Sequence, residues 1–440
     1  MVSARWKSLH PNNPVLQSSR IPSNGRVRKT DMEELSTMIK AAIMGHGTVG
    51  SGVYEVFEMN AEKIARTVGE PVEVKYVLDL RDFSALPYGH KFVSDFSVIE
   101  NDPEVTVVAE VMGGVGAAYE FTKRCLLAGK SVCTSNKELV ATRGEELLKI
   151  AAEKGVNYMF EASVGGGIPI IRPMLQCLAA NEFNEICGIL NGTTNYILTQ
   201  MIHNGVTFAD ALKQAQLNGY AEKDPTADIE GHDACRKICI LADLAFGDKF
   251  DPDQVSCEGI TKITLEDVAN ADKLGCVIKL LGRTVRCEDG TAYAYVAPHL
   301  IHKESPLAAV EDVFNAIMVD GNATGDVMFY GKGAGKLATA SAVVADMLDC
   351  IEHAQHRRLI GWGDGSKNLL RPLDTLQSSW YVRFKGATRD LEALLPVESL
   401  TEPVDGVVVV KTSRLSTADM QDKIAKLNAC GEVCAAMRML

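Results

Sequence analysis

Long hydrophobic runs are missing from this sequence of 440 residues, and no apolar stretch approaches the roughly 20 residues of a membrane-spanning helix. A basic excess is also missing, because 57 Asp and Glu outnumber 45 Lys and Arg, giving a formal charge of −12. We therefore expect neither nucleic acid nor a membrane as a partner. A hydrophobic content of 46% and a charged content of 23% are typical of a globular protein, and the length predicts two or three domains.

The 12 cysteines form no CxxC pair and no zinc-like cluster. Cys235 and Cys239, like Cys430 and Cys434, have the spacing of one helix turn, which favours packing over metal binding. Scattered, unpaired cysteines are typical of a reducing compartment. The sequence therefore predicts a cytoplasmic protein.

The first residues have a composition of their own. Residues 1–30 contain six Lys and Arg and no Asp or Glu, and they lack the apolar centre of a secretory signal. We predict a disordered basic tail over residues 1–36. An organellar transit peptide, or a translation start at Met32 or Met38, would explain the same composition.

A strand, a glycine loop and a helix follow the tail. The apolar run 39–44 predicts a buried strand, which leads into a G-x-G-x-x-G motif at Gly45, Gly47 and Gly50. The three glycines permit a tight turn, close approach of a pyrophosphate and packing of the helix on the strand. The N-terminus of the helix then offers N–H groups to the phosphates. This context predicts a dinucleotide site.

The next two strands lead to further residues of the predicted dinucleotide site. The strand VEVKYVLDL leads to Asp79, and Arg81 follows two residues later. An acid here favours NAD, whereas an arginine favours the additional phosphate of NADP, so the sequence leaves both cofactors open. A further strand over 105–111 ends at Gly113 and Gly114, where glycines line the ligand crevice of an open α/β sheet.

Two regions carry charged candidates for catalysis. Lys137 opens a predicted helix, a position that the helix dipole disfavours. The stretch 219–237, GYAEKDPTADIEGHDACRK, joins an acidic loop to a helix on which Asp233 and Lys237 are four residues apart and share a face. That spacing fits an ordinary surface ion pair as well as a catalytic pair.

Two glycine-containing turns supply further candidates. Three consecutive glycines, 165–167, suit a cation held by backbone oxygens, and they suit a flexible turn equally well. The turn NGTTN over 191–195 carries hydroxyl and amide groups, including that of Thr193, that suit contacts with a polar substrate.

Six motifs in order resemble the homoserine dehydrogenase family across most of the chain, from 38 to 350. They are GHGTVGSG (45–52), TSNKELVA (134–141), EASVGGGIPII (161–171), NGTTNYIL (191–198), the stretch 219–237 and GKGAG with TASAVVAD (331–346). The resemblance implies reversible reduction of L-aspartate 4-semialdehyde to L-homoserine by NADH or NADPH, on the route to threonine and methionine. It also implies a homodimer or homotetramer.

The resemblance implies residue roles as well. Lys237 resembles the proton donor, Lys137 a lysine near nicotinamide and substrate that is sometimes assigned the catalytic role, and Glu222 and Asp233 the substrate ligands. The implied cofactor contacts, with those of the glycine loop, are Gly45, Gly47, Thr48, Val49, Gly50, Arg81, Gly113, Lys137, Gly219 and Gly335. A monovalent cation, Na or K, is expected at Glu161, Val164, Gly166 and Ile168.

Two other functions fit parts of this pattern. One is a Rossmann dehydrogenase that acts on a different amino-acid-derived carbonyl. The other is a catalytically silent nucleotide-binding sensor, which would have little reason to keep Lys137, Glu222, Asp233 and Lys237 together.

We predict an α/β protein with a Rossmann-type nucleotide-binding domain, an α+β substrate and dimerisation domain, and a small α+β unit. The predicted boundaries are 37–156 with 331–360, then 157–330, then 378–440. The last unit resembles a ligand-sensing ACT domain only in its second half. Because the D-x-P-G-V-L-A helix of that family is missing, we expect a shortened unit.

Overall fold

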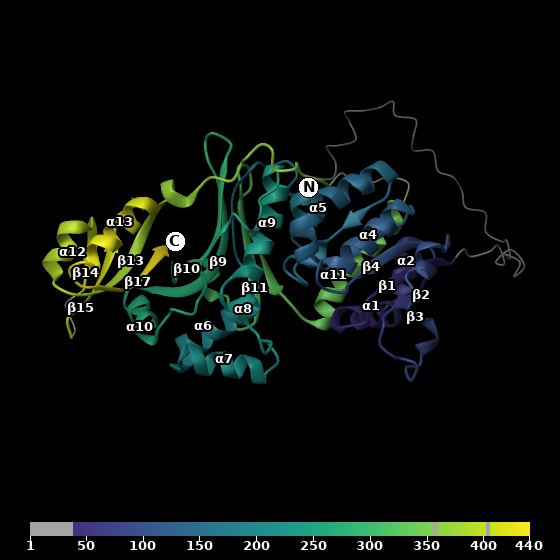
Figure 1. The fold of residues 1–440 in the computed structure, drawn as a ribbon, viewed down its shortest axis with the longest axis horizontal. Helices are drawn as coiled ribbons and strands as arrows, with labels where there is room; N and C mark the ends of the chain where they lie inside the picture. The colour runs from purple at the N-terminus through teal and green to yellow at the C-terminus, as the bar shows by residue number, and fades with distance from the viewer. Residues whose placement is uncertain (1–37, 355–357, 359, 402–404) are drawn as a thin grey trace, which may run out of the picture. The chain divides into compact units, whose positions relative to one another are not determined.

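The computed structural model describes residues 38–354, 358, 360–401 and 405–440 (Figure 1). The predicted tail over 1–36 lies outside the described residues. The described chain builds two sheets, of six and eleven strands.

The first sheet is parallel throughout, with the strand order β3-β2-β1-β4-β5-β6. This order is that of dinucleotide-binding folds, in which the ligand lies at the carboxyl ends of the central strands. The elements are β1 (Ile39–Met44), α1 (Thr48–Met59), α2 (Ala61–Val68), β2 (Val72–Leu78), β3 (Phe92–Val93), α3 (Ser97–Glu100), β4 (Val105–Glu110), α4 (Gly116–Leu127), β5 (Ser131–Thr134), α5 (Lys137–Lys154) and β6 (Tyr158–Met159).

Helices cover both faces of this sheet (Figure 1). Ala41 and Ile43 of β1 share a buried cluster with residues of α1 and of α11 (Lys336–Glu352). Ala42 and Met44 share another cluster with residues of α4 and α5. Because successive residues of a strand point to opposite faces, one continuous apolar run can supply both cores. The chain therefore returns to the first sheet through α11.

The second sheet has the order β12-β11-β7-β9-β10-β17-β13-β15-β14, with β8 and β16 paired to its side. Its first part contains β7 (Phe183–Ile189), α6 (Gly192–Asn204), α7 (Phe208–Leu217), α8 (Thr226–Ile229), α9 (His232–Phe246), β8 (Ser256–Cys257), α10 (Leu265–Lys273), β9 (Cys276–Arg286), β10 (Ala292–His302), β11 (Phe314–Gly321) and β12 (Gly325–Lys332). Helix α9 packs on β7, β9 and β10, and Lys237 in its second turn contacts Leu190, just past the end of β7.

The remaining strands belong to the C-terminal unit. It contains β13 (Gln377–Lys385), α12 (Thr388–Leu394), β14 (Val397–Leu400), β15 (Val407–Thr412), β16 (Leu415–Ser416), α13 (Thr417–Leu427) and β17 (Glu432–Met439). The succession of β13, α12, β14, β15, α13 and β17 is that of a ferredoxin-like unit. Our expectation of a missing first helix is wrong, because α12 occupies that place. Leu391 of this helix is buried in the core of the unit, although the helix lacks the expected motif.

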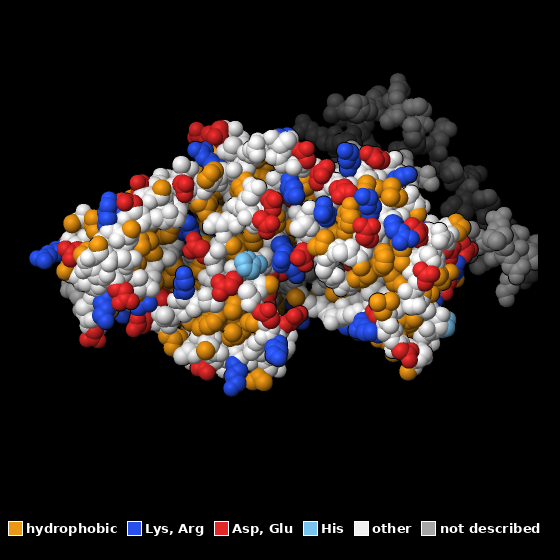
Figure 2. All heavy atoms as spheres, in the orientation of Figure 1, with side chains coloured by type: hydrophobic (Ala, Val, Ile, Leu, Met, Phe, Trp, Pro, Cys, Tyr) orange, Lys and Arg blue, Asp and Glu red, His pale blue; other side chains and the backbone are white. Residues whose placement is uncertain are grey.

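None of the described helices is long and apolar enough to cross a membrane. All twelve cysteines are free thiols, as predicted. Acidic and basic side chains are interspersed over the face of the molecule drawn in Figure 2. Charge alone therefore does not mark a binding surface on this face.

Candidate active site

The glycine loop has the geometry that its motif predicts. Gly45 has φ of 99°, a left-handed value that disfavours other residues, and its N–H donates to the carbonyl of Leu78 at 2.8 Å. A Cβ on Gly50 would lie 1.9 Å from the carbonyl oxygen of Gly45, so only glycine permits this approach of helix to strand. A Cβ on Gly47 would meet no described atom within 4 Å, which leaves that side of the loop open to a ligand. No side chain of the described residues caps α1, so the loop can hold a pyrophosphate.

Asp79 and Arg81 form a bidentate ion pair beside this loop. Arg81 Nε donates to Asp79 Oδ1 at 3.0 Å, and Arg81 Nη2 donates to Asp79 Oδ2 at 2.8 Å. The backbone N–H of His46 also donates to Asp79 Oδ2 at 2.8 Å. These hydrogen bonds, led by the one from Arg81, hold the pKa of Asp79 well below its usual range.

Asp233 holds both candidate lysines. Lys237 Nζ donates to Asp233 Oδ2 at 2.7 Å, and Lys137 Nζ lies 2.9 Å from Asp233 Oδ1. The exposed fractions of the side chains are 7% for Asp233, 10% for Lys237 and 39% for Lys137. An ion pair of the surface type is therefore excluded for Asp233 and Lys237. Lys237 Nζ also donates to the carbonyl of Leu190 at 2.7 Å.

The environment separates the two lysines chemically. Burial lowers the pKa of Lys237, and the positive charge of Lys137 adds to this, although Asp233 opposes it. The charge of Asp233 raises the pKa of Lys137. Burial acts to raise the pKa of Asp233, yet the charges of Lys237 and Lys137 outweigh it and keep that pKa well below normal. Lys237 is thus the lysine that gives up a proton more readily.

Asn191 organises the carboxylates around this centre. Its side-chain amide donates to Asp233 Oδ2 at 2.8 Å and to Asp228 Oδ1 at 2.7 Å, and its oxygen accepts the N–H of Thr194 at 2.9 Å. Burial raises the pKa of Asp228. The sequence indicated only a polar turn at Asn191 and gave Asp228 no catalytic role. The one available signal was a helix-capping Asn preceding a hydroxyl-rich first turn.

Other predicted residues lie around the centre without joining it directly. Glu222 is exposed, and its backbone carbonyl accepts from Gln216 Nε2 at 3.1 Å. The hydroxyl of Thr193 is buried and donates to the carbonyl of Tyr220 at 2.8 Å. Gly219 (φ of 75°) and Gly335 (φ of 125°) both have left-handed backbone, with no described atom within 4 Å of a Cβ. Both positions are therefore open on one side.

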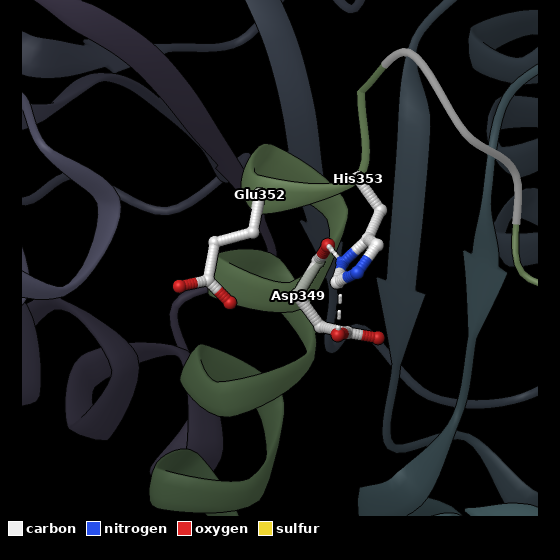
Figure 3. A group of neighbouring side chains, drawn as sticks. All are labelled: Asp349, Glu352 and His353. Atoms are coloured by element: carbon white, nitrogen blue, oxygen red, sulfur yellow. Dashed lines mark hydrogen bonds and ion pairs between the residues drawn. The ribbon is translucent and has the colours of Figure 1, made fainter. Parts of the chain in front are cut away.

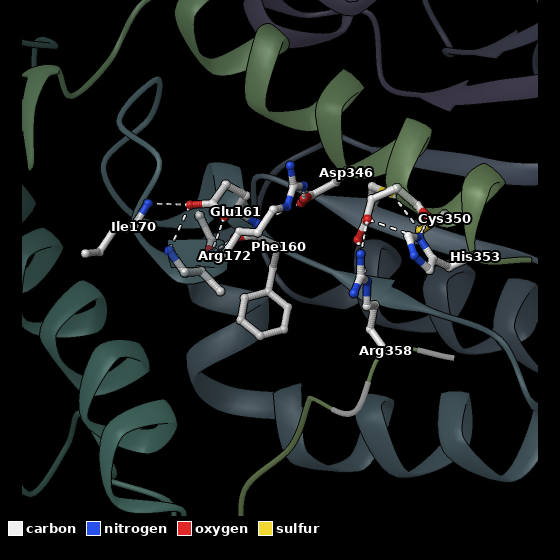
Figure 4. Close-up of polar contacts among 12 residues, drawn as sticks. Phe160, Glu161, Ile170, Arg172, Asp346, Cys350, His353 and Arg358 are labelled. Carbon is white, nitrogen blue, oxygen red and sulfur yellow. Dashed lines mark hydrogen bonds and ion pairs between the residues drawn. The ribbon is translucent and has the colours of Figure 1, made fainter. Parts of the chain in front are cut away.

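The carboxylate of Glu161 is occupied by backbone donors. It accepts the N–H groups of Ile170, Ile171 and Arg172 at 2.6, 2.8 and 2.7 Å. Arg172 Nη2 in turn donates to Asp346 Oδ1 at 2.5 Å, and the N–H of Glu161 donates to Asp346 Oδ2 at 2.8 Å (Figure 4). This network fixes both ends of the predicted cation loop.

The other predicted cation ligands lie within that loop. Val164 and Ile168 are buried, and Gly166 has φ of 56°. A Cβ on Gly166 would lie 2.4 Å from the carbonyl oxygen of Gly333, so glycine is required for this contact. The loop therefore packs closely against the segment that leads into α11.

A second group of possible metal ligands lies near the end of α11. Ligand atoms of Asp349, Glu352 and His353 lie within 4.8 Å of one another (Figure 3). Arg358 Nη2 and Nε donate to the two oxygens of Asp349 at 2.8 and 3.2 Å, and His353 Nδ1 lies 3.0 Å from the carbonyl oxygen of Asp349 (Figure 4). A guanidinium on the carboxylate disfavours a cation there, so we assign no metal to this group.

Hydride transfer to a carbonyl needs a dinucleotide cradle next to a proton donor, and the fold and site together define a nicotinamide-dependent dehydrogenase. The family profile "Homoserine dehydrogenase, NAD binding domain" matches residues 45–161, and "Homoserine dehydrogenase" matches residues 169–348. The chain is 40% identical over 419 residues to the homoserine dehydrogenase of Pseudomonas aeruginosa, covering 89% of this chain and 95% of that one. The chain belongs to the homoserine dehydrogenase family.

Solved structures agree with this assignment. A homoserine dehydrogenase from Thiobacillus denitrificans superposes with a TM-score of 0.84 at 35% identity, covering 92% of this chain and 98% of that one. A hyperthermophilic archaeal homoserine dehydrogenase in complex with NADPH gives a TM-score of 0.61 at 27% identity, covering 71% and 97%. The resemblance inferred from the motifs and the predicted Rossmann-type α/β fold are both confirmed. The protein is an oxidoreductase that acts on a CH–OH group with a nicotinamide cofactor.

Proposed function

We propose that Lys237 is the proton donor of this homoserine dehydrogenase and that Lys137 is a second cation beside the reacting carbonyl. The proposal is based on the position of Asp233, which lies between the two lysines and forms an ion pair with each of them. A lysine ammonium has three donors, and Lys237 uses two of them on Asp233 and Leu190 among the described residues. The third N–H is available for a substrate oxygen.

The reaction requires few groups from the chain. The nicotinamide supplies or accepts the hydride when it is bound. As the carbonyl of aspartate semialdehyde is reduced, negative charge develops on its oxygen, and Lys237 transfers a proton to that oxygen. Lys137 stabilises the same charge and keeps its own proton, because Asp233 raises its pKa. In the oxidation of homoserine the steps run in reverse, with neutral Lys237 as the base.

Asp233, Glu222 and Thr193 are the proposed substrate-binding residues. Asp233 is buried and charged, so it suits an ammonium or hydroxyl group of the substrate. Glu222 lies on the exposed loop ahead of α8, where its side chain is open to a substrate group. Thr193 also holds this loop through its hydrogen bond to the carbonyl of Tyr220.

Replacement of the lysines tests these roles. We expect Lys237→Met to lower kcat for homoserine oxidation by about 10²–10⁴-fold, the usual contribution of general acid–base catalysis. Lys137→Met should lower kcat less, since it removes charge but no proton donor. Lys223→Met, at an exposed lysine of the same loop, is the matched control and should behave as wild type. Near-normal turnover of Lys237→Met would reject the proposal.

We propose NADP as the preferred cofactor. Both oxygens of Asp79 already accept hydrogen bonds, and the Arg81 side chain is 63% exposed, so a 2′-phosphate would meet a guanidinium in place of a free carboxylate. The archaeal neighbour was solved with NADPH, which is consistent with this choice. Arg81→Ala should lower kcat/KM with NADP and leave that with NAD largely unchanged. A wild-type enzyme that prefers NAD would reject the proposal.

A monovalent cation, Na or K, is proposed at the loop 161–168, bound by backbone oxygens of Glu161, Val164, Gly166 and Ile168. The carboxylate of Glu161 already accepts three amides, so a backbone oxygen is its available ligand. Dialysis against a bulky organic cation, followed by measurement of activity as Na or K is restored, tests this. Full activity without either ion would reject it.

The C-terminal unit is proposed to be an ACT-like regulatory unit. A cavity of about 350 Å³ lies between this unit and the part of the second sheet that holds β8 and β10, lined among others by Glu258, Arg371, Asp374, Thr417 and Arg438. Two arginines and two acids suit a zwitterion such as an amino acid. Thermal-shift titration with threonine and other amino acids tests this, with Arg371→Ala as the variant that should lose the shift.

A homodimer or homotetramer in the cytoplasm is proposed for the assembled enzyme. Edge strand β12 exposes Met328 (38%) and Tyr330 (54%) on one side, and an unpaired edge with apolar residues suits pairing with a second copy. Twelve free thiols support a reducing compartment. Light scattering on the wild type and on a Met328→Lys, Tyr330→Lys variant tests the assembly, and cell fractionation tests the location.

A further inference from the structure

Glu110 is a fully buried carboxyl group at the end of β4 that has no role in the chemistry above. Its exposed fraction is 0%. Its Oε1 accepts the N–H of Met112 at 2.9 Å, and its Oε2 accepts the hydroxyl of Thr134 at 2.6 Å. A buried carboxyl group is costly unless its hydrogen bonds are satisfied, and burial raises the pKa of Glu110. The two hydrogen bonds offset this cost and join the loop after β4 to the end of β5.

The hydrogen bonds of Glu110 continue to the start of α5. Thr134 Oγ1 accepts the N–H of Asn136 at 2.9 Å while donating to Glu110. The side-chain oxygen of Asn136 accepts the N–H of Leu139 at 3.1 Å and so caps α5. Its amide Nδ2 donates to the carbonyl of Gly114 at 2.6 Å. The loop after β4 and the first turn of α5 are therefore joined through Glu110, Thr134 and Asn136.

The two ends of this chain of hydrogen bonds are the loop at Gly113 and Gly114 and the first turn of α5. Gly113 and Gly114 have φ of 129° and 66°, and a Cβ on either would meet no described atom within 4 Å. Lys137 is the first residue of α5, with a side chain 39% exposed, and the cap at Asn136 fixes the turn from which it extends. Reacting groups must be held to within roughly 0.5 Å, and a 1 Å displacement can cost about 10²-fold in rate.

We infer that Glu110, Thr134 and Asn136 are positioning residues, which hold the Gly113–Gly114 loop against the cofactor and Lys137 against Asp233 in one fixed geometry. The inference rests on the cofactor contact that the family resemblance implies for Gly113 and on the electrostatic role proposed for Lys137. It extends them, because it makes cofactor binding and the placement of Lys137 depend on the same three side chains. Loosening any one of them should disturb both.

Thr134→Val tests the inference, because valine keeps the shape of threonine and removes both hydrogen bonds. At a temperature where the variant is fully folded, we expect the Kd of NADPH, measured by its fluorescence without substrate, to rise at least threefold. We also expect kcat to fall by about ten- to a hundredfold. Thr134→Ser keeps the hydroxyl and should restore both. Thr122→Val is a matched control, since Thr122 is also buried and its hydroxyl has no partner among the described residues.

Asn136→Ser separates positioning from folding. Serine still caps α5 but is too short to reach Gly114, so we expect a weaker Kd for NADPH with a melting temperature close to that of the wild type. A purely structural role would lower the melting temperature and leave kcat and the Kd of the folded enzyme unchanged. If Lys137→Met is impaired but Thr134→Val shows only a lower melting temperature, with unchanged kcat and Kd, the inference is overturned. An active Lys137→Met variant would overturn the proposed role of Lys137, and the inference with it.

Discussion

Asp233→Asn is the substitution that tests the site most directly, because asparagine keeps the shape of Asp233 and removes its charge. Two cations then lose the carboxylate oxygens that lie 2.9 Å from Lys137 and 2.7 Å from Lys237. Lys137 is 39% exposed and can turn toward water, whereas Lys237 is 10% exposed and cannot. The substitution therefore leaves mainly Lys237 as a buried charge without its partner. We expect the free energy of unfolding to fall by about 3 kcal/mol, the lower end of the range for a broken buried ion pair.

The same substitution should change the pH dependence of catalysis. In the reduction of aspartate semialdehyde, Lys237 must carry its proton, so kcat falls as the pH rises through the pKa of Lys237. Asp233 raises that pKa, and without it the pKa of Lys237 is lower. The fall in kcat should therefore occur at lower pH in Asp233→Asn. General acid catalysis contributes about 10²–10⁴-fold, and we expect a loss near the lower end because Lys237 is retained.

The assay is kcat against pH at saturating substrate, followed by the absorbance of the reduced cofactor, with urea unfolding on the same preparations. Asp224→Asn is the control, because Asp224 is an exposed acid of the same stretch whose partner among the described residues is Thr226. It should leave both measurements unchanged. An unshifted pH profile together with wild-type stability in Asp233→Asn would refute the reasoning.

Three further substitutions test other parts of the structure. Gly50→Ala should weaken NADPH binding more than tenfold and cost about 1–3 kcal/mol, since its Cβ would lie 1.9 Å from the Gly45 carbonyl oxygen; fluorescence titration and urea unfolding measure this. Asp267→Ala removes the 2.8 Å partner of Arg383, whose side chain is 7% exposed, and should lower stability by about 3 kcal/mol in urea unfolding, the lower end for a broken buried pair, because Glu266 still pairs with Arg383. Burial raises the pKa of Asp346 to about 7, so the folded state holds a proton that the unfolded state releases above about pH 4. Wild-type stability should fall from about pH 4 to 7 through this group, and Asp346→Asn should remove that part of the slope; equal slopes would contradict it.

Elements with a strong local signal were predictable from the sequence. The apolar run 39–44 has the bounds of β1. The glycine loop was predictable because its backbone conformation and close contacts exclude residues other than glycine, which leaves a recognisable motif in the sequence. Helix α12 was not, because the expectation relied on a family motif that this helix lacks, and the burial of Leu391 is a property of the folded chain.

Contacts between segments that are far apart in the chain could not be predicted from the sequence. Asp233 and Lys237 could be paired because they lie four residues apart on one helix. The bridge from Asn191 to Asp228 and Asp233 could not, because it joins segments 37 and 42 residues apart whose approach depends on the packing of α6 against α8 and of α9 against β7. Burial, which separates the pKa values of the two lysines, is likewise a property of the folded chain.

The position of β17 has a consequence for how the chain folds. This strand lies between β10 and β13 inside the second sheet, where His299 pairs with Arg438. During synthesis β17 leaves the ribosome after every other strand of that sheet. Until then, the edges of β10 and β13 that pair with β17 remain unpaired. Such late, long-range pairing slows folding and exposes strands to aggregation. A nascent chain of this enzyme should therefore depend on chaperones until its last strand has been made, even though the first sheet can form early.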